Sequence, residues 1–214
     1  MKIVSSILRG AGVALLLLSP LPVLSQAYPA KPVRAVVPYP PGGAPDLVTR
    51  LIAQRISVPL GQSVVVENRP GASSIIGTEY VARAAPDGYT ILLGTTTTHV
   101  TNMLLMRKLP YDAFRDFTPI VAVLEGTRVA SLPDVPTVKE SVPGFEKPSG
   151  RYAFFGPAGL PQPIVSRLNA EIVKVLQTPD IRAGFEANAQ LVIASSPAEL
   201  AALMKRPLKP LSRQ

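Results

Sequence analysis

The first half of the chain alternates short β-branched runs with amphipathic segments. Val33–Val37 (VRAVV), residues 63–67 (SVVVE) and residues 90–94 (TILLG) have the composition of buried strands. Between them, residues 45–59 and 75–85 carry apolar side chains at helical spacing, and each segment ends at proline or glycine. Strand, helix, strand, helix, strand is typical of a parallel sheet covered by helices. The sequence therefore predicts an α/β fold with a parallel-rich sheet flanked by helices.

The second half continues this pattern after an interruption. Strands are predicted at 118–124, 152–156 and 191–194, and helices at 161–178 and from 179 to about 189. A last helix is expected at Ser196-Pro197-Ala198-Glu199, because this run combines a capping box with proline at the first helical position.

The interruption covers residues 125–150. Prolines at 133, 136, 143 and 148 break every periodic pattern there and leave room for one short helix near 137–141. The final residues, 207–214, are predicted to be an irregular tail because two prolines follow the last helix closely.

Residues 1–27 have the three regions of a secretory signal peptide. Lys2 and Arg9 precede the apolar run AGVALLLL, and Ser25-Gln26-Ala27 places small residues where a signal peptidase cuts. A retained membrane anchor is the disfavoured alternative, because the apolar run is shorter than the roughly 20 residues that span a bilayer. The sequence predicts export to the periplasm with cleavage after Ala27.

Composition excludes several kinds of site. The chain has no cysteine and one histidine, His99, which excludes a disulfide framework, a thiolate zinc site, an iron–sulfur cluster and a multi-histidine metal site. No metal or other cofactor is expected. The formal net charge is +8, but the lysines and arginines are dispersed and do not interleave with aromatic residues. Nucleic acid is therefore not an expected partner, although a mild positive field would gather small anions.

Two loops are expected at the carboxyl ends of predicted strands, where open α/β sheets bind ligands. The candidate ligand-binding residues of the first loop are Tyr39, Pro40, Pro41, Gly42, Gly43, Ala44 and Asp46. Those of the second loop are Thr95, Thr96, Thr97, Thr98 and His99.

The first loop combines stiffness with close access to its backbone. Its prolines restrict it, and its glycines let a ligand approach the chain. The following helix has no serine, threonine or asparagine cap, so its first N–H groups are available to an anion. Asp46 argues the other way, since its carboxylate could satisfy the helix dipole. An ordinary glycine-rich turn is the open alternative, and a phosphate loop is excluded because no Gly-Lys-Ser/Thr follows.

The second loop offers four hydroxyls that could bind a carboxylate directly or through water. The alternative, a polar helix start, is favoured on this run considered by itself. A catalytic His99 would need a nucleophile and an orienting carboxylate, and there is no Gly-x-Ser-x-Gly. We therefore expect a structural His99 and no enzyme activity, and we expect Asp112 and Asp116 to be turn residues.

Several segments, read together, resemble the Bug-type periplasmic solute receptors of tripartite tricarboxylate transporters. They cover nearly all of residues 28–203 in the order of the family. They are YPAKPV at 28–33, VPYPPGG at 37–43, VVENRPGA at 65–72, APDGYT at 85–90, KLPYD at 108–112 with DF at 116–117, LPDVPT at 132–137 and GPAG at 156–159.

The resemblance implies a type II periplasmic-binding-protein architecture, in which two α/β lobes close on a small carboxylate. Ligands of the family are dicarboxylates, tricarboxylates, acidic amino acids or aromatic acids. The family's counterparts of the two loops line the cleft and meet the carboxylate through backbone, hydroxyls and ordered water. The resemblance also implies a monomer whose partners are the membrane components of a tripartite tricarboxylate transporter.

The chain departs from the family between residues 124 and 128. There the fourth strand joins directly to a segment that the family reaches only after its second lobe, so a domain of on the order of 100 residues is expected to be missing. The aromatic residue that the family places before its phenylalanine-glycine segment is represented by Tyr152. The expected organisation is a signal peptide (1–27), two parts of the first lobe (28–124 and 151–206), a proline-rich connection replacing the second lobe (125–150) and the tail (207–214). A weakly binding or non-functional remnant of a receptor is the open alternative.

Overall fold

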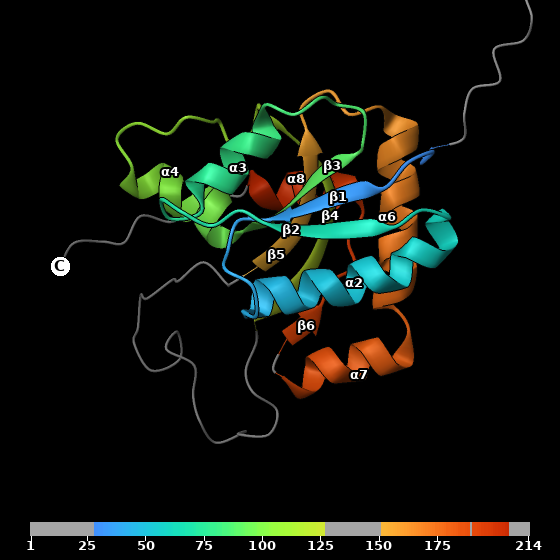
Figure 1. The fold of residues 1–214 in the computed structure, drawn as a ribbon. Helices are drawn as coiled ribbons and strands as arrows, with labels where there is room; N and C mark the ends of the chain where they lie inside the picture. The colour runs from blue at the N-terminus through green and yellow to red at the C-terminus, as the bar shows by residue number, and fades with distance from the viewer. Residues whose placement is uncertain (1–27, 127–150, 189, 206–214) are drawn as a thin grey trace, which may run out of the picture.

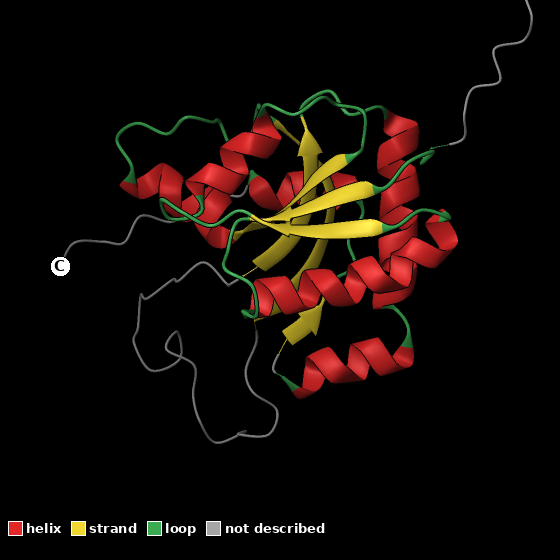
Figure 2. Ribbon diagram, viewed as in Figure 1, coloured by secondary structure: helices red, strands yellow, loops and turns green. Residues whose placement is uncertain are grey.

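A computed structural model describes residues 28–126, 151–188 and 190–205 of the 214-residue chain. Within them, six strands form one sheet in the order β2-β1-β3-β5-β4-β6, and helices cover both of its faces (Figures 1 and 2). The expected signal peptide, the short helix near 137–141 and the tail at 207–214 lie outside the described residues.

The predicted elements are present with small shifts at their ends. The strands are β1 (Val33–Val37), β2 (Val64–Asn68), β3 (Thr90–Thr95), β4 (Phe117–Gly126), β5 (Arg151–Pro157) and β6 (Gln190–Val192). The helices are α2 (Ala44–Leu60), α3 (Ile75–Ala82), the π-helix η2 (Thr97–Thr101), α4 (Asn102–Leu105), α6 (Gln162–Leu176), α7 (Pro179–Ala187) and α8 (Pro197–Met204). η2 begins in the threonine run where a polar helix start was the alternative prediction, whereas α4 was not predicted. The segment expected at 75–85 is helical only to Ala82, and Arg83 is its C-cap.

The direction of the strands changes across the sheet. β1 runs parallel to β2 and β3, with Val33 opposite Val64 and Arg34 opposite Thr90, as the strand–helix alternation predicted. The remaining neighbours are antiparallel: β3 with β5, β5 with β4, and β4 with β6. The sheet is therefore mixed. As a result, β1, β3 and β4 end, and β5 begins, at the same edge of the sheet.

The alternation of side chains along each strand divides the core into two parts. Val33, Ala35 and Val37 of β1 face a cluster shared with α2, α6 and α7, whereas Val36 faces a second cluster on the opposite side of the sheet. Apolar side chains of α6 complete the first cluster, so this helix packs back on the sheet formed by the N-terminal strands, as predicted. They are Val165, Leu168, Ile172 and Val175.

Helix ends follow the local signals in the sequence. Gly61 ends α2 in the left-handed conformation with a φ of 68°, and its N–H donates to the carbonyl of Val58. The capping box at the start of α8 is present, because Ser196 Oγ accepts from Glu199 N–H at 3.2 Å and Glu199 Oε2 accepts from Ser196 N–H at 2.7 Å. Over the described part of the chain, no helix is both long enough and apolar enough to cross a membrane.

Gly94 lies in β3 opposite Ala153, at a position that has no room for a side chain. A Cβ atom at this position would lie 2.6 Å from the ring of Phe155 and 2.7 Å from that of His99. We expect Gly94→Ala to lower the free energy of unfolding by about 1–3 kcal/mol, because both rings are buried and cannot move freely. Urea unfolding measures this change.

The matched control is Gly184→Ala in α7, where a Cβ atom meets nothing within 4 Å. This variant is expected to be as stable as the wild type or more stable by up to about 1 kcal/mol, because alanine is the better helix former. Equal stability of Gly94→Ala and the wild type would contradict the close packing of β3 on β5.

Candidate functional site

The two candidate loops lie at the edge of the sheet where β1, β3 and β4 end and β5 begins. The first loop links β1 to α2, and the second links β3 to η2 and α4. This edge is where an open α/β sheet is expected to bind a ligand.

The N-terminus of α2 is open to a ligand. Gly43 occupies the N-cap position in an extended conformation, and no side chain caps the helix. Pro45 has no N–H, and the N–H groups of Ala44 and Asp46 donate to no acceptor within the described residues. Free N–H groups and the positive end of the helix dipole favour an anion at this point.

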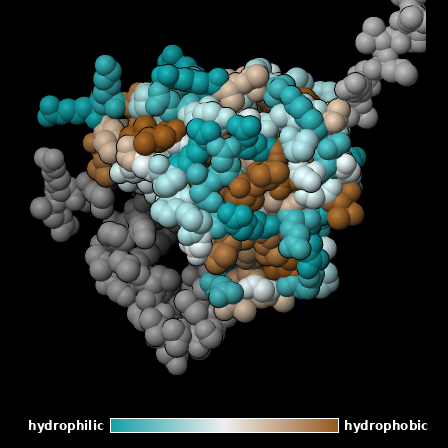
Figure 3. Space-filling view, viewed as in Figure 1, coloured by the Kyte–Doolittle hydropathy of each residue, from teal (hydrophilic) through white to brown (hydrophobic). Residues whose placement is uncertain are grey.

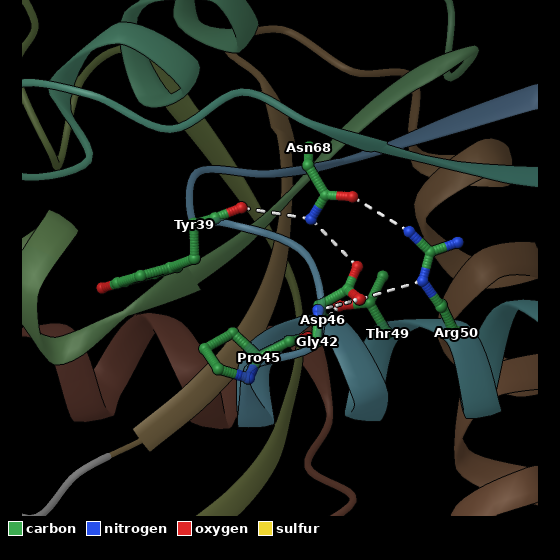
Figure 4. A network of polar contacts seen from close by, with 7 residues as sticks. All are labelled: Tyr39, Gly42, Pro45, Asp46, Thr49, Arg50 and Asn68. Carbon is green, nitrogen blue, oxygen red and sulfur yellow. Dashed lines mark hydrogen bonds and ion pairs between the residues drawn. The ribbon is translucent and has the colours of Figure 1, made fainter.

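Asp46 stabilises the first loop instead of facing outward. Its side chain is buried, and its Oδ2 accepts from the N–H of Gly42 at 2.8 Å and from Arg50 Nε at 3.0 Å (Figure 4). Its Oδ1 accepts from Asn68 Nδ2 at 2.9 Å. The hydrogen bond from Arg50, with smaller contributions from Gly42 and Asn68, lowers the pKa of Asp46 to about 2. The carboxylate therefore turns back onto the loop and does not cap the first N–H groups of the helix.

Asn68 and Arg50 extend this network and were not among the predicted site residues. Asn68 Nδ2 also donates to the carbonyl of Tyr39 at 3.1 Å, and Arg50 donates to Asn68 Oδ1 at 2.9 Å (Figure 4). The pair Asp46 and Arg50 has the i,i+4 spacing of a helical ion pair, so that signal was present in the sequence. The contact of Asn68 comes from β2 and depends on the fold.

The threonines of the second loop mainly organise their own backbone. Thr98 Oγ1 accepts from the N–H of Thr95 at 2.8 Å, and Thr95 Oγ1 accepts from the N–H of Thr97 at 3.1 Å. Thr96 Oγ1 accepts from the N–H of Arg151 at 3.0 Å, which ties the loop to β5. A helix does start here, as the alternative prediction held, although it is a π-helix. Thr96 and Thr97 stay half-exposed, whereas Thr98 is buried.

One hydrogen bond joins the two loops. Tyr39 Oη and Thr95 Oγ1 lie 2.7 Å apart, although the residues are 56 positions apart in the sequence. Tyr152 of β5, which is paired with Thr95 in the sheet, lies beside them. Burial, and secondarily the proximity of Tyr39, raises the pKa of Tyr152. The edge therefore gathers the hydroxyls of Tyr39, Thr95 and Tyr152.

His99 points into the interior. Its ring stacks on Phe155 with centroids 4.0 Å apart and meets Phe117 edge-on at 4.9 Å. Nδ1 is 2.8 Å from Thr98 Oγ1, and Nε2 has no hydrogen-bond partner among the described residues. Burial lowers the pKa of His99 to about 3, so the ring is neutral at pH 7. This is the structural histidine that the sequence favoured, and its ring packs beneath the second loop rather than at the open edge.

Asp112 and Asp116 are turn residues, as predicted. Asp112 Oδ1 accepts from the N–H groups of Phe114 at 2.9 Å and Arg115 at 3.0 Å, and Asp116 Oδ2 accepts from the N–H of Asp112 at 2.7 Å. The hydrogen bonds from the N–H groups of Phe114 and Arg115 lower the pKa of Asp112. Both carboxylates are therefore engaged in the loop before β4.

The family model for the tripartite tricarboxylate transporter family receptor matches residues 48–125 and 120–209. The chain belongs to this family. The model matches as two segments that meet at the end of β4.

Curated relatives include protein BugT of Bordetella pertussis, which is 42% identical over 103 residues, 48% of this chain and 32% of the relative. A UPF0065 protein of Bordetella bronchiseptica is 35% identical over 148 residues, 68% of this chain and 44% of the relative. The aligned part of this chain thus spans about a third of the length of BugT and less than half of the length of the UPF0065 protein.

Solved periplasmic binding proteins share the fold. BugD superimposes with a TM-score of 0.77 at 24% identity, over 84% of this chain and 94% of that chain. MatC from Rhodopseudomonas palustris, solved with bound malate, gives a TM-score of 0.76 at 24% identity, over 83% of this chain and 96% of that chain. A second R. palustris protein, solved with adipate, gives a TM-score of 0.73 at 22% identity, over 83% of this chain and 94% of that chain.

The buried, neutral state of His99 makes stability depend on pH. Its pKa is about 3 in the folded chain and 6.5 in the unfolded chain, so the unfolded chain binds a proton first as the pH falls. The stability that depends on neutral His99 is complete above pH 6.5 and is lost between pH 6.5 and 3, at up to about 1.4 kcal/mol per pH unit. We expect that in His99→Leu and His99→Gln the free energy of unfolding, measured with urea, depends less on pH over this range than it does in the wild type.

The comparison is between the slopes of the pH profiles, because either variant can shift stability uniformly through changed packing. Parallel profiles of the wild type and both variants would contradict the burial of a neutral His99.

Proposed function

We propose that the chain is a periplasmic solute-binding protein that captures a small carboxylate for a tripartite tricarboxylate transporter. The observation that carries this proposal is the hydrogen bond between Tyr39 and Thr95, which holds an uncapped helix N-terminus beside a row of hydroxyls. Membership of the receptor family supports it. The neighbours solved with malate and with adipate both hold dicarboxylates, which favours a dicarboxylate among the candidate ligands.

The ligand carboxylate would lie against the free N–H group of Ala44, which is exposed at the N-terminus of α2. N–H groups at a helix N-terminus bind carboxylates without a cationic side chain, which suits this loop because Arg50 is occupied by Asp46. Tyr39, Thr95 and Tyr152 would supply hydroxyl contacts, directly or through water. Gly42 and Gly43 keep the approach to the amides open. His99 and Thr98, which are buried under the second loop, would hold this loop in position and would not contact the ligand.

We further propose that the second lobe of the family is missing from this chain. The two matched segments of the family model overlap at residues 120–125, next to the junction expected between residues 124 and 128, which supports the proposal. β4 and β5 are paired neighbours, with Glu125 opposite Arg151, so β4 ends and β5 begins at the edge that carries the site.

A receptor that has one lobe instead of two, and so one side of the cleft, is expected to bind its ligand weakly. A cleft that closes buries roughly 70–90% of a ligand, whereas a ligand on one wall stays largely hydrated, and each hydrogen bond then competes with water. The weakly binding remnant is therefore the second candidate, and affinity distinguishes it from a working receptor. An enzyme that uses His99 gains no support from the site, because burial removes the ring from the edge.

Isothermal titration calorimetry with malate, adipate, citrate, glutamate and benzoate tests the proposal. If a two-lobed relative binds near 1 μM, losing half of its contacts leaves a Kd on the order of 1 mM. The expected result is millimolar binding of at least one acid. Gly43→Val should abolish it, because valine tolerates the extended backbone at this N-cap and covers the amides.

Gly184→Val, in α7 with open space around it, is the control and should bind like the wild type. The absence of binding by every acid at tens of millimolar would contradict the receptor proposal. A micromolar ligand would contradict the proposal that one wall is missing.

A further inference from the structure

We propose that the end of α4 and the turn after it, residues 104–108, form a docking surface for an anionic lipid bilayer. This segment, called here the α4 tip, carries Leu104, Leu105, Met106, Arg107 and Lys108 in succession. The proposal concerns where the protein works in the cell and does not depend on the identity of the ligand.

The α4 tip exposes three consecutive large apolar side chains. Leu104 is 65% exposed, Leu105 74% and Met106 39%. The other exposed large apolar residues of the described chain have no such neighbour next to them in the sequence, as Val58 and Val65 show. Figure 3 shows brown side chains gathered over α4 at the left of the molecule, with teal ones projecting beside them. Single exposed apolar residues are ordinary on a protein surface, whereas a contiguous group indicates an interaction site.

The base of the α4 tip is fixed, so the leucines cannot fold back to bury themselves. Asn102 is buried and donates to the carbonyl of Ser73 at 2.9 Å, and Met106 N–H donates to the carbonyl of Asn102 at 2.9 Å. Met103 and Leu109, which flank the tip, pack against the second core cluster. The fold thus directs Met103 and Leu109 inward and presents the apolar residues between them to the outside.

Two cations follow the apolar group directly. Arg107 and Lys108 are exposed and form no ion pair with any described residue, whereas Arg115 in the next turn is paired with Asp112 at 3.4 Å. Unpaired cations next to exposed leucines match the surface of an anionic bilayer, where apolar side chains insert and cations meet phosphate groups. Residues 28–214, which would remain after cleavage behind Ala27, carry a formal net charge of +6, and this charge adds long-range attraction to an anionic surface.

The position of the α4 tip relative to the site suits this partner. η2 and α4 follow β3 from the edge of the sheet that carries Thr95 and Tyr39. A protein held at a bilayer through the α4 tip would therefore keep the binding edge near the membrane, where transporter components would receive the solute.

Tryptophan fluorescence gives a direct test, because the chain has no tryptophan. Leu105→Trp introduces a single fluorophore at the α4 tip, and Val58→Trp places one on α2 as a control. The protein is purified from periplasmic extract and mixed with vesicles of phosphatidylcholine, with or without phosphatidylglycerol. The expected result is a blue shift of Leu105→Trp emission with phosphatidylglycerol vesicles only, and no shift for Val58→Trp.

Vesicle co-sedimentation of otherwise unaltered chains measures the two contributions separately. Leu104→Ser/Leu105→Ser and Arg107→Gln/Lys108→Gln should each lower the partition coefficient about tenfold or more, and Val58→Ser should leave it unchanged. Added salt should weaken binding of the wild type.

Three outcomes overturn the proposal. The first is no preference for phosphatidylglycerol vesicles, which would leave a protein partner as the occupant of the α4 tip. The second is full binding by Leu104→Ser/Leu105→Ser, which would indicate a purely electrostatic attraction. The third is an equal blue shift at positions 58 and 105.

Discussion

The hydrogen bond between Tyr39 Oη and Thr95 Oγ1 is the contact on which the candidate site depends. It joins two loops that the sequence separates by 56 residues. The bond is possible because β1 and β3 are parallel neighbours, so that both loops leave the sheet at one edge. A slip of either strand by one residue would turn its side chains to the other face and separate the two hydroxyls.

The hydrogen-bond network around Asp46 determines the structure of the first loop and of the N-terminus of α2. A carboxylate in the first turn of a helix ordinarily occupies the positive end of the dipole. Here Arg50, Asn68 and the N–H of Gly42 hold the Asp46 carboxylate against the loop, so the first amides of α2 remain free. The same network fixes the carbonyl of Tyr39 through Asn68, so the position of the tyrosine and the access to the helix are set by one group of contacts.

Local signals predicted most of the architecture. The valine-rich runs form β1 and β2, and α8 begins at the capping box of Ser196. The apolar face of α6 packs against the sheet, as its helical periodicity predicted. Both candidate loops were found in the same way, because they follow strands. Less was predictable where the outcome depended on contacts distant in sequence. The inward turn of His99 depends on the rings of Phe117 and Phe155, and the place of Tyr152 beside the site depends on antiparallel pairing of β5 with β3.

The central claim is that the two loops act as one carboxylate site on a single lobe, and residue-resolved NMR titration tests it most directly. Malate or adipate is added to ¹⁵N-labelled protein while the amide resonances are followed. We expect the amide resonances of Ala44, Thr96 and Thr97 to shift together along one saturation curve with an apparent Kd on the order of 1 mM. Shifts confined to one loop, or centred elsewhere on the lobe, would contradict it.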